Sequence, residues 1–343
     1  MSTVDIDKLM GKRIIAFDCL RAFAISLVLI CHLGQSFGVP LFGIAGGVAN
    51  CIFFILSGLC LGVDWHKHGC IVYDWEFLRK RMVRLYIPFL CFLIPYLLVL
   101  WANDVTGWGV MCLNILMFSW FAPLPGAGHL WFVTGMLFQY VLLFCVTRFY
   151  FRTKIRGLAL ALIILIICLS GQVVFVITGI GQGYLLMLLA AGVIFFVFGD
   201  WIIRALMKCS NRCMLAFVMA ICLLGIVGIV GVRSNQTVYY WLCMMVAVSV
   251  SCGFLLSIRT DQCNPIIMFV SSISYEIYLI HYPLCAGSPL FLRKILHNGW
   301  VYSATVIIGS LVGGFLLNRL VKILTEDLSA KYMNSLLRQK LAK

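Results

Sequence analysis

Charge is scarce in this sequence, and negative charge is the scarcest. Only 11% of the 343 residues are charged, with 12 Asp and Glu against 26 Lys and Arg, whereas 63% are hydrophobic. No soluble core of this size needs so much apolar sequence, so the composition predicts a polytopic membrane protein. The net charge of +14 lies in clusters between apolar segments, which indicates orientation in a membrane and not binding of nucleic acid.

Paired cysteine motifs and long polar stretches are also lacking. None of the 16 cysteines has CxxC spacing, and most of them lie in apolar segments, so neither a disulfide framework nor a metal site is expected. The longest polar intervals are about twenty residues. We therefore expect one transmembrane domain over residues 1–343, without an appended soluble domain.

Ten apolar segments are long enough to span a bilayer. We expect spans at about 14–37, 43–63, 85–101, 129–147, 157–178, 183–203, 213–232, 238–257, 265–285 and 300–319. With ten spans, the Lys and Arg clusters all fall on the side of the N-terminus, which the positive-inside rule places in the cytoplasm. The prediction is an all-α polytopic membrane protein of about ten transmembrane helices with both termini cytoplasmic. Residues 102–128 would form an outer loop or re-entrant segment, and residues 320–343 a cytoplasmic amphipathic tail.

The first span carries ionisable side chains, which are costly inside a membrane. Residues 17–32 read FDCLRAFAISLVLICH and contain Asp18, Arg21 and His32. Arg21 and His32 are about three helical turns apart, so they project from one helical face and lie about 16 Å apart along its axis. Either residue alone fits a snorkelling cation or a satisfied core histidine, but the pair in register favours a functional site.

Two later stretches add polar candidates. FLRKRMVRLYIP at 77–88 places Arg81 and Arg84 on one helical face, where two guanidiniums can bind a phosphate, although positive-inside charge explains the cluster about equally well. SYEIYLIHYPL at 274–284 and HLWFV at 129–133 bring imidazoles and aromatic rings to the expected outer ends of two spans, where they fit either one cavity or interfacial anchors.

In this order, these motifs resemble the membrane-bound acyltransferase family 3. The first run matches its Asp-x-Leu-Arg-(ten residues)-His signature, and FFILSG at 53–58 joins the three stretches above as later landmarks. The resemblance covers nearly the whole chain, although Ala22 replaces the usual glycine and Glu276 stands where a small residue is common. It implies transfer of an acyl group, usually acetyl, from acyl-CoA to a hydroxyl of a surface or lipid-linked carbohydrate, in the bacterial cytoplasmic membrane.

The resemblance and the residue chemistry together give the expected site. The catalytic candidates are His32, Arg21 and Asp18, with His32 as general base or covalent acyl carrier. Arg81, Arg84 and Arg21 would bind acetyl-CoA or another acyl-CoA, which is made in the cytosol and carries phosphates. The substrate-binding candidates for the carbohydrate are His281, Glu276, His129, Trp131 and Tyr278.

Two alternatives stay open at this point. A membrane carrier or flippase for a lipid-linked sugar or small anion would use Arg21 as an anion site and His32 as a proton relay. An acyltransferase could also move a succinyl group in place of acetyl. The expected partners are membrane lipid and the carbohydrate acceptor, and no metal is expected.

Overall fold

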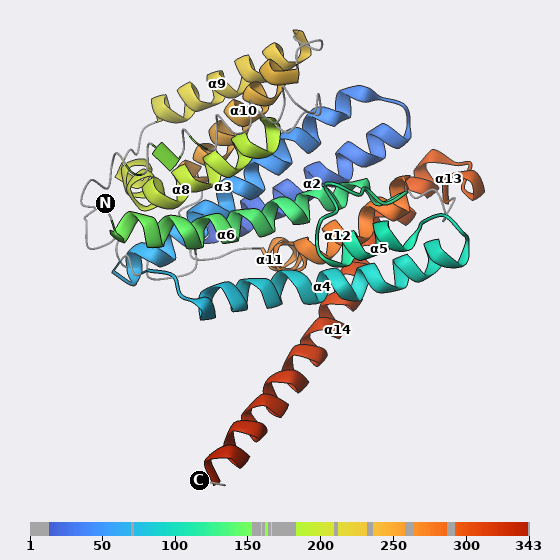
Figure 1. The fold of residues 1–343 in the computed structure, drawn as a ribbon. Coiled ribbons are helices and arrows are strands. Elements are labelled where there is room, and N and C mark those ends of the chain that lie inside the picture. The colour runs from blue at the N-terminus through green and yellow to red at the C-terminus, as the bar shows by residue number, and fades with distance from the viewer. Residues whose placement is uncertain are drawn as a thin grey trace. The chain divides into compact units, whose positions relative to one another are not determined.

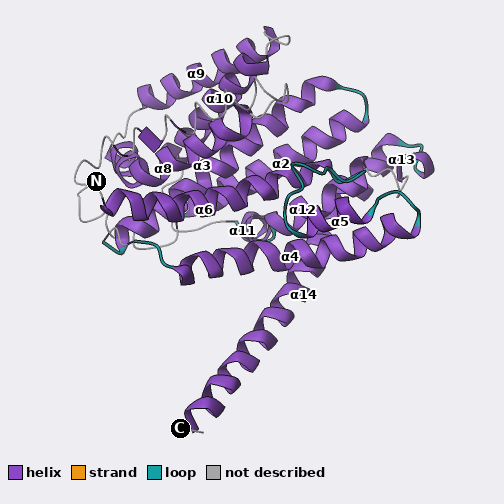
Figure 2. Ribbon diagram, in the orientation of Figure 1, coloured by secondary structure: helices purple, strands orange, loops and turns teal. Residues whose placement is uncertain are grey.

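The protein was analysed as a computed structural model. It describes residues 14–69, 72–152, 183–208, 212–231, 236–257, 264–286 and 292–341, together with 159, 162, 163 and 166. The regular structure of these residues is helical, and no strand occurs among them, which confirms the all-α prediction for this part of the chain (Figure 2).

Figure 1 shows the helices of the described residues. They are α2 (Ile15–Ser36), α3 (Gly43–Lys67), α4 (Trp75–Ala102), α5 (Trp108–Ile115), α6 (Trp131–Arg152), α8 (Gly183–Lys208), α9 (Arg212–Gly231), α10 (Gln236–Ser257), α11 (Pro265–Ser272), α12 (Ser274–Ala286), α13 (Leu292–Ile295) and α14 (Gly299–Leu341), with short 3₁₀ turns η1 (Pro40–Phe42) and η2 (Gly128–Leu130).

Seven helices in the described residues are long and apolar enough to cross a membrane, which suits an integral membrane protein. Their candidate spans are Ile15–Ser36, Gly43–Lys67, Trp75–Ala102, Gly128–Tyr150, Tyr184–Leu206, Val238–Ser257 and Gly299–Glu326. The expected count of about ten is not confirmed. The expected span 157–178 lies almost entirely outside the described residues, and the apolar part of α9, Met214–Val230, is shorter than the seven.

The expected span 265–285 is divided into two helices. Helix α11 ends at Ser272 and α12 begins at Ser274, with a turn at Ile273 between them. Three serines surround this turn, and the Ser272 hydroxyl donates to the Phe269 carbonyl oxygen at 2.7 Å. Serine side chains that bond to nearby backbone groups weaken or bend a helix, which gives the break a local cause that apolar length alone does not reveal.

The chain divides into two compact units, which are described separately. Unit 1 comprises Met1–Arg81 and Trp131–Ser272, and unit 2 comprises Met82–Leu130 and Ile273–Lys343. In unit 1, α3 packs against α2, α8 and α10. A Cβ atom on Gly58 of α3 would overlap the carbonyl oxygen of Gly192 on α8, so these backbones are in direct contact. Gly58, in the FFILSG stretch, thus permits a close helix approach that fixes α3 beside α8.

In unit 2, residues 102–130 fold as a short segment and not as a span. Helix α5 has eight residues, about 12 Å of rise, which is less than half of a hydrocarbon core. Two tyrosines of α4 bind carbonyl oxygens of this segment: Tyr86 donates to Ile115 at 2.8 Å, and Tyr96 donates to Pro125 at 2.7 Å. These bonds hold the segment on α4, while its outer or re-entrant position stays a prediction.

Helix α14 packs against α12 in unit 2 and runs without a break from Gly299 to Leu341 (Figure 1). The part that fits a membrane span is Gly299–Glu326. Residues 320–341 therefore continue the helix of the last span, and their position on the inner leaflet stays a prediction.

Candidate functional site

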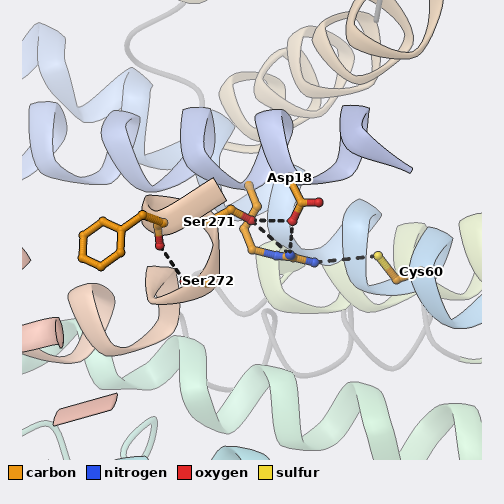
Figure 3. A network of polar contacts seen from close by, with 6 residues as sticks. Asp18, Cys60, Ser271 and Ser272 are labelled. Atoms are coloured by element: carbon orange, nitrogen blue, oxygen red, sulfur yellow. Dashed lines mark hydrogen bonds and ion pairs between the residues drawn. The ribbon is translucent and has the colours of Figure 1, made fainter. Parts of the chain in front are cut away.

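A cluster of polar side chains lies where α2, α3 and α11 meet in unit 1 (Figure 3). The Ser271 hydroxyl donates to Asp18 Oδ1 at 2.8 Å, and Arg21 Nη1 lies 3.4 Å from the same oxygen. Arg21 Nη1 also lies 3.3 Å from Ser271 Oγ, and Arg21 Nη2 lies 3.9 Å from Cys60 Sγ. One carboxylate oxygen therefore holds both the serine and the guanidinium, and α11 completes a site begun on α2.

The two charged residues of this cluster, Asp18 and Arg21, differ in burial. Asp18 is 3% exposed, whereas 30% of the Arg21 side chain is accessible. A buried carboxylate requires a partner, since an unpaired charge in an apolar interior is strongly destabilising. Asp18 and Ser271 thus hold Arg21 in position, and its partly accessible side chain suits contact with an anionic ligand.

His32 lies further along the same unbroken helix α2, which confirms the helical spacing expected between it and Arg21. Its Nδ1 lies 2.9 Å from the Gln35 side-chain oxygen, one turn later. A carbonyl oxygen only accepts hydrogen bonds, so this contact favours the tautomer with the proton on Nδ1 and the lone pair on Nε2. In this tautomer, Nε2 has the form that a general base needs.

The cations at the start of α4 fall into two groups. Glu76 accepts two hydrogen bonds from Arg79, at 2.7 and 2.8 Å, and lies 3.6 Å from Lys80. Arg81 and Arg84 form no ion pair with a described residue. The acidic residue of this helix start therefore pairs with Arg79 and Lys80 and not with Arg81 or Arg84, whose guanidiniums can bind an anion.

In unit 2, the expected imidazoles are brought together and buried. The rings of His129 and His281 are 5.2 Å apart, and His129 stacks on Tyr282 at 4.8 Å. Their side chains are almost fully enclosed, His129 being 4% exposed and His281 0%. The Tyr278 hydroxyl donates to the His129 carbonyl oxygen, which ties η2 to α12. Two imidazoles and Tyr278 therefore lie together in unit 2, while the expected cavity around them stays a prediction.

The two remaining candidates have other surroundings. Glu276 is 6% exposed and accepts a hydrogen bond from Asn318 of α14 at 2.8 Å, also in unit 2. Trp131 belongs to unit 1, where its ring lies 6.0 Å from that of Tyr184. The carbohydrate-binding role of all five residues stays a prediction.

Sequence reasoning missed several partners. Gln35 follows His32 by one helical turn, and that spacing could have identified it. Ser271 and Asn318 could not be found in this way, because they reach Asp18 and Glu276 from 253 and 42 residues away. Among the described residues, no group of three His, Cys, Asp or Glu side chains could hold a metal ion.

Comparison with known proteins agrees with the motif order. Residues 14–319 match a family model, acyltransferase 3, described as an acyltransferase domain. No curated protein and no solved structure matches the chain. The match begins just before α2 and ends within α14, so it includes every candidate residue above.

Proposed function

The chain belongs to the acyltransferase 3 family and is a membrane acyltransferase, and on this premise we propose that it is an O-acetyltransferase. The donor is cytosolic acetyl-CoA, and the acceptor is a hydroxyl of an extracytoplasmic or lipid-linked carbohydrate. The membrane is the bacterial cytoplasmic membrane, with both termini inside. Since the family is one of acyltransferases, the carrier alternative is not retained.

His32 is the proposed general base. Its Nε2 takes the proton of the acceptor hydroxyl while the oxygen attacks the thioester carbonyl carbon. The tetrahedral intermediate then collapses with cleavage of the C–S bond, and the proton on His32 passes to the departing CoA thiolate. The products are the acetyl ester and free CoA. The Gln35 contact supports this role, because a ring that donates from Nδ1 carries its basic lone pair on Nε2.

Arg81 and Arg84 are the proposed phosphate ligands of the donor. They form no ion pair with a described residue, whereas the neighbouring Arg79 and Lys80 are paired with Glu76. Charge-assisted bonds from arginine to phosphate contribute about 1.5–3 kcal/mol each. Arg21, held by Asp18 and Ser271, is the third proposed donor contact, on the helix that also carries His32.

The single observation that carries the proposal is the arrangement on α2. One apolar helix holds a positioned, partly accessible guanidinium and, about three turns further, an imidazole in the tautomer of a base. The aromatic and imidazole cluster of unit 2, His129, His281 and Tyr278, together with Glu276 and Trp131, supplies the proposed carbohydrate contacts, since such side chains offer both stacking faces and hydrogen bonds.

A comparison of surface carbohydrate tests the proposal. Cells that express the protein should yield carbohydrate heavier by one acetyl group per modified hydroxyl than cells that lack it, as measured by mass spectrometry. His32→Ala should insert into the membrane in normal amount and abolish the added mass. A mass increment that fits succinyl would mean that the donor is succinyl-CoA and not acetyl-CoA. Full modification of the carbohydrate by His32→Ala would show that His32 has no role in the mechanism.

A further inference from the structure

An exposed tryptophan and an unneutralised arginine lie against the same buried ring in unit 1. The Trp75 ring, 69% exposed, lies 5.0 Å from the ring of Phe144, which is 7% exposed. The Arg148 guanidinium carbon lies 4.5 Å from the same ring. Phe144 thus holds an accessible aromatic face from α4 and a cation from α6 within one small area.

Arg148 has no acidic partner among the described residues. It forms no ion pair there, and its Nε atom is enclosed without a hydrogen-bond acceptor in the same part of the chain. An enclosed donor without an acceptor is unfavourable, so the position is suited to an anionic ligand that supplies one. The stacking on Phe144 fixes the plane of the guanidinium before any ligand arrives.

The surroundings keep this arrangement rigid. Tyr73 bonds through its backbone N–H to Thr147 Oγ1 at 3.2 Å and through its hydroxyl to the Leu61 carbonyl oxygen at 3.1 Å. Its ring stacks on Phe77 at 3.7 Å, and the Arg81 guanidinium carbon lies 5.5 Å from the Phe77 ring. The start of α4 is therefore fixed to α3 and α6, and a second cation, Arg81, lies along it.

We propose that Trp75, Phe144 and Arg148 form the subsite for the nucleotide end of the donor, with the base on Trp75 and the terminal phosphate on Arg148. This rests on the proposed use of acyl-CoA, whose far end is an adenine beside a ribose 3′-phosphate, followed by a diphosphate. The ring and the cation fit the base and the 3′-phosphate, and Arg81 lies on the same helix start for the diphosphate. A lipid headgroup would offer a phosphate but no base to the exposed ring.

The competing interpretation of an exposed tryptophan is an interfacial anchor. Trp201 of α8 provides the matched control, because it is 70% exposed and also sits near the end of a helix, beside the Arg204–Asp200 ion pair. Among the described residues, its ring makes no aromatic contact with Phe144 and no cation–π contact with Arg148. If Trp75 were only an anchor, Trp75→Ala and Trp201→Ala would change donor binding equally. If it forms a nucleotide subsite, only Trp75→Ala would weaken donor binding.

The test uses three donors and one binding probe, with the full-length protein in nanodiscs. The first donor is acetyl-CoA. The second, acetyl-dephospho-CoA, lacks the 3′-phosphate, and the third, acetyl-phosphopantetheine, lacks the whole nucleotide. Trp75→Ala should raise the KM for acetyl-CoA about fivefold or more, the effect of one lost base stack, and leave the KM for acetyl-phosphopantetheine unchanged. Trp75→Phe should retain most of the affinity for acetyl-CoA. Arg148→Met should make the KM for acetyl-CoA equal to that for acetyl-dephospho-CoA.

Binding of adenosine 3′,5′-diphosphate to the same preparations gives a readout that needs no transfer. Its dissociation constant should rise in Trp75→Ala and Arg148→Met and stay unchanged in Trp201→Ala. Equal effects of the two tryptophan variants, or wild-type probe affinity in Trp75→Ala, would overturn the subsite. Transfer from the truncated donor by every variant would show that the acyltransferase itself is intact, whereas no transfer from any thioester by the wild type would contradict the proposed function.

Discussion

Ser271→Ala is the sharpest perturbation of the charged cluster on α2. It removes the hydroxyl that donates to Asp18 Oδ1 at 2.8 Å and lies 3.3 Å from Arg21 Nη1, and it leaves the 3.4 Å contact of Arg21 with the same carboxylate oxygen. A hydrogen bond to a charged group contributes about 1.5–3 kcal/mol. Asp18 is buried, so the carboxylate that loses the serine depends more strongly on Arg21 and draws the guanidinium away from an anionic substrate.

The lost hydrogen bond sets the ceiling of the effect. If Arg21 must be held in its observed position for transfer, the rate should fall by about 10- to 150-fold, since each 1.36 kcal/mol corresponds to a factor of ten. Ser272→Ala is the matched control, because it removes the same atom from the neighbouring residue, whose hydroxyl bonds within the described residues to the Phe269 carbonyl oxygen on its own helix (Figure 3). Ser272→Ala should retain transfer within about twofold of wild type.

The assay is acetyl transfer by membranes that contain equal amounts of each variant, quantified by immunoblot, with the thermal stability of the purified variants as a second measurement. Equal activity of Ser271→Ala and Ser272→Ala would refute the reasoning that Asp18 and Ser271 position Arg21. If Ser271→Ala lowers the amount of protein or its melting temperature in parallel with activity, Ser271 acts only in folding.

Other contacts give further predictions. Gln35→Met should lower kcat at least fivefold with little change in the donor KM. Gln35→Glu still accepts a hydrogen bond from His32 Nδ1–H and should retain most of kcat. Equal kcat values for the two variants would show that Gln35 has no role in the mechanism. Gly58→Val should destabilise the protein by about 1–3 kcal/mol, because the new side chain meets the α8 backbone, and lower the melting temperature by several degrees. Gly253→Ala, whose Cβ meets its nearest neighbour at 3.9 Å, is the control and should leave the melting temperature nearly unchanged.

The sequence predicted the positions of the long helices well, because a membrane helix depends on a local property. An uninterrupted apolar run of sufficient length must satisfy its own backbone hydrogen bonds, and α2, α3 and α10 follow such runs to within a few residues. The start of α4 was placed ten residues late, at 85 against Trp75, because its first turns carry Glu76, Arg79 and Lys80 and are not apolar. Hydrophobicity marks the membrane-embedded part of a helix and not its polar extension.

The site was predictable only in part, for a physical reason. The residues of the first span, Asp18, Arg21 and His32, stood out because charge is costly in an apolar run. Their partners did not, since Ser271 reaches Asp18 across 253 residues and a serine in a span is not costly enough to attract attention. The break at Ile273, which ends α11 next to that serine, depends on side-chain bonds to the backbone that apolar length does not encode.

Transfer across a sealed membrane tests the central claim most directly. Inside-out vesicles with acceptor carbohydrate trapped in the lumen are given labelled acetyl-CoA from outside, where the cytoplasmic face now lies. The account predicts label on the luminal carbohydrate without entry of the donor, loss of that label in His32→Ala, and a donor KM raised at least tenfold in the double variant Arg81→Ala with Arg84→Ala. Label that appears only after the vesicles are permeabilised would contradict the account, because both substrates would then have to meet on one side of the membrane.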